Sequence, residues 1–87
     1  MTKVVFRSPI KIGVNEALTL SRVAENTGHT IYIRKNKKDK FLTMNSVVGF
    51  LSLRIKKGNT ITLLCDLDGR AGENILNEVK TNFETLT

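Results

Sequence analysis

The 87-residue sequence contains one cysteine, one proline, one histidine and no tryptophan, and these scarcities exclude several classes of protein. The single cysteine, Cys65, cannot form an internal disulfide, which is typical of a chain in a reducing compartment. No apolar run approaches the ~20 residues that a membrane-spanning helix needs. The first residues lack the long apolar stretch of a signal peptide. We therefore expect a cytoplasmic protein with an aliphatic core and no membrane segment.

Catalytic and metal-binding groups are equally scarce. His29 is the only histidine, and no cluster of cysteine, histidine and carboxylate has the spacing of a metal site. Cys65 falls at an inward-facing position of an expected strand, so we interpret it as a small core residue rather than a redox thiol. We expect no metal, no other cofactor and no enzymatic activity.

The net charge of +6 is large for so short a chain and raises the question of an anionic partner. The basic residues are spread widely, except for a dense run from Arg34 to Lys40. We interpret that run as a solvated hairpin. Nucleic-acid binding is not expected there, because neither interleaved aromatics nor a recognisable motif accompanies it. A basic module for an anionic partner, nucleic acid or an acidic protein, stays open as an alternative function.

Hydrophobic periodicity predicts seven elements in the order β-α-β-β-α-β-α. We expect Asn15 to cap the first helix and either Asn45 or Ser46 to cap the second. The expected strands cover residues 2–8, 30–34, 41–44 and 60–65, and the first two helices cover residues 15–27 and 47–53. The last helix carries a continuous apolar stripe made by Ala71, Ile75, Leu76, Val79, Phe83 and Leu86.

This order of elements indicates an α+β fold, an open-faced β-sandwich. A four-stranded antiparallel sheet would be covered on one side by three helices. Because a chain of this length supports one modest core, we expect a single domain over residues 1–87.

The segment from Asn45 to Leu63 carries the most specific motif, Asn-Ser-Val-Val-Gly-Phe-Leu-Ser-Leu-Arg-Ile-Lys-Lys-Gly-Asn-Thr-Ile-Thr-Leu. It resembles the Lys-Ser-Ile-Met-Gly-Val-Met-Ser-Leu-Gly-Ile-Ala-Lys-Gly-Ala-Glu-Ile-Thr-Ile of HPr, the small phosphocarrier of bacterial sugar phosphotransferase systems. Weaker similarity, at Phe6, Gly13 and the closing amphipathic helix, extends over most of the chain. The resemblance implies an HPr-like domain.

The family's second signature, Gly-Ile-His-Ala-Arg-Pro-Ala, is not kept. Its counterpart here runs from Gly13 to Thr19. Asn15 stands at the position of the phosphorylated histidine, Ala17 at that of the assisting arginine and Leu18 at that of the proline. A shifted alignment places Gly13 at the histidine, with no better chemistry. Because the amide nitrogen of asparagine is conjugated with its carbonyl and is not a nucleophile, we expect no catalytic residue.

Ser46 is the remaining candidate for a modified residue. In Gram-positive members of the family a dedicated kinase phosphorylates the matching serine. The paralogue called catabolite-repression HPr (Crh), which also lacks the histidine, signals through it. A phosphate at the start of a helix would be favoured by the helix dipole. The simpler alternative is that Ser46 is an N-cap alone, and both alternatives stay open.

A docking surface is expected beside this serine. Val47, Val48 and Leu51 match the family positions that form an exposed apolar patch. At least two of the three should lie outside, because other apolar residues are available for the interior. Asn15 and Leu20 on the first helix would complete this partner-binding surface.

These features predict a non-enzymatic regulatory or adaptor protein that is similar to Crh. Its expected partners are proteins, such as an HPr kinase/phosphorylase and a transcription regulator, and the chain would be a monomer or a weak dimer. A phosphocarrier in sugar uptake is the alternative function.

Overall fold

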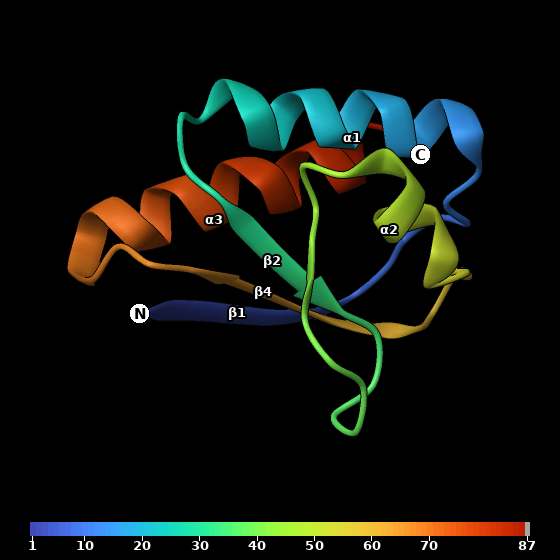
Figure 1. Cartoon of the computed structure of the whole chain (residues 1–87), viewed down its shortest axis with the longest axis horizontal. Helices are drawn as coiled ribbons and strands as arrows, with labels where there is room; N and C mark the ends of the chain where they lie inside the picture. The colour runs from blue at the N-terminus through green and yellow to red at the C-terminus, as the bar shows by residue number, and fades with distance from the viewer. Residues whose placement is uncertain (87) are drawn as a thin grey trace.

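The computed structural model, in which residues 1–86 are described, has the predicted order of elements (Figure 1). The strands are β1 (Thr2–Arg7), β2 (Ile31–Arg34), β3 (Leu42–Thr43) and β4 (Thr60–Cys65). The helices are α1 (Val14–Asn26), α2 (Val47–Ser52) and α3 (Gly69–Thr85).

The four strands form one antiparallel sheet in the order β1-β4-β2-β3. All three helices lie on the same side of this sheet and leave its other face open (Figure 1). The two neighbours of β4 are distant from it in sequence, since Val4 pairs with Leu63, and Leu63 with Ile33. The α+β open-faced β-sandwich expected from the sequence is confirmed.

The strands sort their side chains by alternation, as the two-residue period of a strand requires. In β1, Val4 and Phe6 pack against the core, whereas Lys3, Val5 and Arg7 are exposed on the opposite face. The central strand β4 behaves in the same way, because its inward residues Ile61, Leu63 and Cys65 are fully buried. Cys65 is therefore a core residue, as the sequence predicts.

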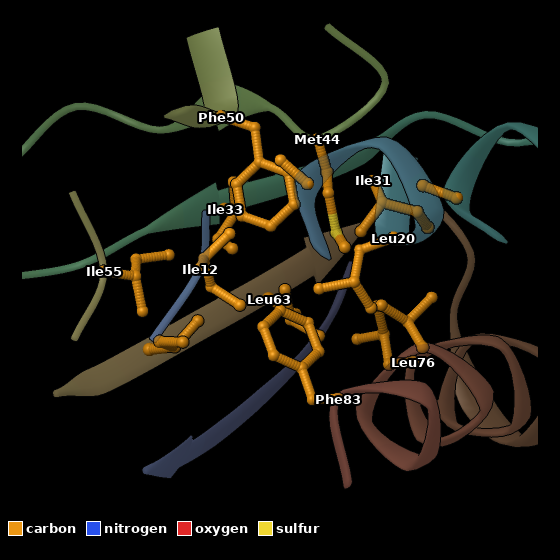
Figure 2. Packing of buried hydrophobic residues seen from close by; sticks show 14 of the residues in the cluster. Ile12, Leu20, Ile31, Ile33, Met44, Phe50, Ile55, Leu63, Leu76 and Phe83 are labelled. Atoms are coloured by element: carbon orange, nitrogen blue, oxygen red, sulfur yellow. The ribbon is translucent and has the colours of Figure 1, made fainter. Parts of the chain in front are cut away.

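The core lies between the sheet and the helices (Figure 2). Phe50 of α2 and Phe83 of α3 are its largest buried side chains, and their ring centroids lie 6.4 Å apart. Phe6 of β1 meets Phe83 edge to face at 5.2 Å. Each such side chain contributes about 1.5–3 kcal/mol by leaving water. One aromatic cluster thus joins two of the helices to an edge of the sheet.

Three details of the elements differ from the sequence prediction. The N-cap of α1 is Gly13 rather than Asn15, because the Glu16 side chain reaches back to the Gly13 backbone and starts the helix earlier. Strand β3 has only two residues, because the lysine-rich loop takes up part of the predicted strand. Ala71 is exposed, and Gly72 faces the sheet in its place.

In the described part of the chain no helix is long and apolar enough to cross a membrane.

Gly72 marks a close contact between α3 and β1. A Cβ atom at this position would lie 2.5 Å from the Leu67 carbonyl oxygen and 2.8 Å from the Thr2 Cβ. The Thr2 hydroxyl also donates to the Leu67 carbonyl at 2.6 Å, so the chain before α3 is fixed against β1. Only a residue without a side chain allows this approach.

We predict that Gly72→Ala lowers the free energy of unfolding by about 1–3 kcal/mol, because the new methyl group must displace backbone atoms. The loss should occur even though alanine favours a helix by about 1 kcal/mol relative to glycine. Urea denaturation measures the change.

Asn74→Ala is the matched control, because Asn74 is exposed on the same helix. Its stability should stay unchanged or rise by up to about 0.7 kcal/mol. A stable Gly72→Ala protein would contradict the close packing of α3 on β1.

Candidate functional site

The candidate site is built on the start of α2, which Ser46 caps. The Gly49 backbone N–H donates to the Ser46 Oγ at 3.4 Å, and the Phe50 N–H donates to the Ser46 carbonyl at 2.9 Å. Ser46 has an extended backbone (φ −96°, ψ 112°) and an exposed side chain. The predicted cap is confirmed, and its hydroxyl faces solvent.

Asn45 has a different task, which the sequence does not reveal. Its side-chain oxygen accepts from the Ile31 N–H at 3.2 Å, and its carbonyl accepts from the Ser21 hydroxyl at 3.0 Å. Asn45 thereby joins the chain segment before α2 to both β2 and α1. The position of Ser46 relative to α1 is therefore fixed by hydrogen bonds between segments far apart in sequence.

The end of α2 is also defined locally. Phe50 anchors the helix in the core, and the Ser52 hydroxyl donates to the Gly49 carbonyl at 2.5 Å. Arg54 then adopts a left-handed conformation with φ 51°, where the HPr motif has glycine. The short helix is held at both ends and in the middle, so its exposed residues have defined positions.

The apolar surface differs in part from the expectation. Val48 is 80% exposed, but Val47 and Leu51 are half-buried and pack against the core. The reason is helical geometry: Val47 and Leu51 are neighbours of the buried Phe50 on the core side of α2, and Val48 points away. Expecting two of the three outside was therefore wrong.

Helix α1 contributes residues that the sequence did not single out. Val14 is 61% exposed and Leu18 is 39% exposed, one helical turn apart on a helix that is in contact with α2. Leu20, which was expected in the partner surface, is fully buried because it lies on the inward stripe with Ala17 and Ala24. Asn15 is exposed as expected. We call the set Val14, Asn15, Leu18, Ser46 and Val48 the α1–α2 surface.

The N-terminus of α1 is occupied by the chain's own carboxylate. The Gly13 N–H donates to Glu16 Oε1 at 2.9 Å, and a Cβ at position 13 would lie 2.9 Å from the same oxygen. Helix N-termini favour anions because of their free N–H groups and dipole. Glu16 uses one of these groups, and its charge repels a second anion at the same place.

Burial favours the shifted alignment of the HPr histidine motif. Ala17 is fully buried, so its side chain points away from the surface on which an arginine could contact a phosphate. The shifted alignment places the N-cap Gly13 at the histidine position and the exposed Asn15 at the arginine position. Neither alignment places a nucleophilic side chain at the helix start.

His29 lies beyond the opposite end of α1. The helix has 13 residues, and at 1.5 Å per residue its length is about 20 Å. The imidazole of His29 is therefore too far from the N-terminus of α1 to replace the missing nucleophile. Among residues 1–86 no group of three or more histidine, cysteine or carboxylate side chains could hold a metal ion.

With this geometry in place, the comparisons with known proteins define the class of fold. No protein-family model matches the chain, and no curated protein does so either. Solved structures do match over nearly the whole chain, and they show that it has the fold of the HPr phosphocarriers.

Three solved structures illustrate the similarity. HPr-C-His from Thermoanaerobacter tengcongensis is 22% identical, with a TM-score of 0.78 over 98% of this chain and 93% of that one. The histidine-containing phosphocarrier protein of Mycoplasma is 20% identical, with a TM-score of 0.78 over 98% and 94%. The catabolite repression protein Crh of Bacillus subtilis, described as a swapped dimer, is 19% identical, with a TM-score of 0.68 over 98% and 93%. The predicted resemblance to HPr and Crh is confirmed at the level of the fold.

The contact between Glu16 and Gly13 leads to a stability prediction. Glu16→Ala should lower the free energy of unfolding by about 1 kcal/mol, because α1 loses a capping hydrogen bond and a favourable charge at its N-terminus. Thermal or urea denaturation measures the change.

Glu25→Ala is the matched control, because Glu25 is an exposed acid in the last turn of the same helix. A negative charge there opposes the dipole, so stability should not fall. Equal losses in the two variants would contradict the capping role of Glu16.

Proposed function

We propose that this protein is a non-catalytic regulatory adaptor that binds partner proteins through the α1–α2 surface and is controlled by phosphorylation of Ser46. The exposed cap serine beside the exposed Val48 is the observation that carries this proposal. The partners that fit are a kinase of the HPr kinase/phosphorylase type and a transcription regulator. Such a protein would act in the cytoplasm as a monomer or weak dimer.

The apolar side chains of the α1–α2 surface support protein binding. Val14, Leu18 and Val48 are exposed on two helices that are in contact with each other. Exposed apolar groups that gather on a small domain favour an interface with another protein. Asn45 and Ser21 hold the two helices in a fixed relation, so the surface needs little rearrangement on binding.

The chemistry at the start of α1 supports the loss of phosphate transfer. A phosphocarrier needs a nucleophilic nitrogen that can accept and release a phosphoryl group. Gly13 and Asn15 offer none, Glu16 already occupies the helix N-terminus, and His29 is remote. The surface that in a carrier would deliver phosphate would here serve for docking alone.

Phosphorylation of Ser46 would change this surface in a defined way. The modification adds a charge of about −2 and three acceptor oxygens. The free N–H groups at the start of α2 and the helix dipole favour that charge. Because Val48 is two residues away, an apolar docking surface would become a strongly anionic one.

We predict that an HPr kinase with ATP adds one phosphate per chain and that Ser46→Ala abolishes the incorporation. Ser52→Ala is the matched control, because Ser52 is an exposed serine on the same short helix whose hydroxyl bonds within α2. It should be phosphorylated like the original chain. Intact-mass spectrometry measures both, and no incorporation by an active kinase would contradict the regulatory proposal.

The same assay tests the docking surface. Val48→Ser should slow phosphorylation while Ser46 remains present, because the kinase must bind beside its acceptor. Val5→Ser is the comparison, since Val5 is 54% exposed on the open side of the sheet. Equal rates in the two variants would place the docking surface elsewhere.

We predict that phosphoenolpyruvate and the first enzyme of the phosphotransferase system leave the chain unmodified. A histidine-containing HPr in the same reaction should gain an acid-labile phosphate, which acid treatment and mass spectrometry detect. An acid-labile phosphate on this chain would instead support a phosphocarrier in sugar uptake.

A further inference from the structure

One region of the folded molecule carries a net charge equal to that of the whole chain, +6. Seven of the 14 lysines and arginines and one of the eight acids, Asp39, lie on the open face of the sheet or in the adjoining β2–β3 loop, and seven minus one leaves +6. The rest of the chain balances seven cations against seven acids. We call the seven cations the basic face: Lys3, Arg7, Arg34, Lys35, Lys37, Lys38 and Lys40.

The sheet register brings these cations together. Val5 pairs with Thr62, and Thr62 pairs with Arg34 on the opposite side of the central strand. Lys3 and Arg7 flank Val5 on the same open face, because alternate residues of a strand share a face. The β2–β3 loop extends from the end of β2 on the side away from the helices (Figure 1).

A shallow pocket of about 290 Å³ marks the centre of the basic face. Its lining combines cations and hydroxyls from three strands and the loop: Lys3, Arg34, Lys35, Lys37, Thr60 and Thr62. No carboxylate lines it. Phosphate groups are bound in proteins by this combination of lysine, arginine and hydroxyl side chains.

Local contacts hold the loop in place over the sheet. The Arg34 guanidinium stacks on the Phe41 ring at 4.4 Å and donates to the Lys37 carbonyl at 3.3 Å. Asp39 accepts from the Asn36 amide at 3.3 Å, so the single acid of this region is engaged within the loop. The lysines are thus presented from an ordered hairpin.

Although the lysine-rich run by itself gives no reason to expect nucleic-acid binding, the sheet register adds Lys3 and Arg7 to it. We propose that the basic face binds the phosphate backbone of duplex DNA without sequence preference. Charge complementarity carries the proposal, because the open face and the β2–β3 loop together carry a net charge of +6. A protein partner would need apolar anchors, and protein interfaces are about half apolar. Val5 is the only apolar residue in the pocket lining, which suits the more polar and more positive surfaces that bind nucleic acid.

No aromatic ring lines the pocket, which favours a duplex over a single strand. Single strands are bound by stacking their bases on aromatic side chains. The Phe41 ring is covered by Arg34, and Tyr32 is half-buried in the sheet. A duplex keeps its bases stacked internally and offers only its phosphates, which is the chemistry that the basic face matches.

The test is fluorescence anisotropy with a labelled mixed-sequence DNA duplex and the full chain. Binding should weaken by about 100-fold between roughly 50 and 200 mM salt if about four phosphates are neutralised. The variant Lys3→Gln/Lys35→Gln/Lys37→Gln should bind at least about 10-fold more weakly and show a shallower salt dependence.

The matched control is Lys11→Gln/Arg22→Gln/Arg70→Gln, which removes the same charge from exposed positions outside the sheet and the β2–β3 loop. It should retain most of the binding, and circular dichroism should show that both variants are folded. Equal losses in the two variants, or no binding by the original chain, would overturn the proposal. So would tighter binding to a single strand, or equal binding to poly-glutamate, because either would indicate a different anionic partner.

Discussion

Covering the sheet on one side only is the constraint on which the rest of this structure depends. Each strand has to sort its residues between an apolar interior and an open face, and the central strand β4 does so with Ile61, Leu63 and Cys65 inward. The helices then bring their own inward stripes to the same interior, where Phe50 and Phe83 meet. Two surfaces of different chemistry result: an apolar one on the helices and a basic one on the strands.

The start of α1 is the second feature on which the proposed function depends. A helix N-terminus is a ready site for an anion. In this chain the Glu16 carboxylate accepts from the Gly13 N–H at that site, and the neighbouring positions carry no nucleophile. Here the hydrogen bond between the Gly13 N–H and Glu16 stabilises the start of the helix. On the same side of the molecule, the proposed docking surface has Ser46 at the start of α2 and exposed apolar side chains on α1 and α2.

The two proposed surfaces are compatible because they lie on opposite layers. The α1–α2 surface belongs to the helices, and the basic face belongs to the sheet and the β2–β3 loop. A partner protein bound to the helices would therefore leave the sheet accessible. In this arrangement a charge change at Ser46 would act on the docking side and leave the basic pocket's own residues unchanged.

The sequence by itself determined the order of elements, the inward positions of the strands, the cap at Ser46 and the absence of a nucleophile in the histidine motif. These features depend on local periodicity, capping and residue chemistry. Only the tertiary structure decided that Val47, Leu51 and Leu20 face the core, that Val14 and Leu18 do not, and that α1 begins at Gly13. Tertiary pairing also decided that Lys3 and Arg7 join the lysine-rich loop, because β1 and β2 lie on either side of β4. This proximity depends on the order and the register of the strands. Residues that are distant in sequence determine both of these jointly.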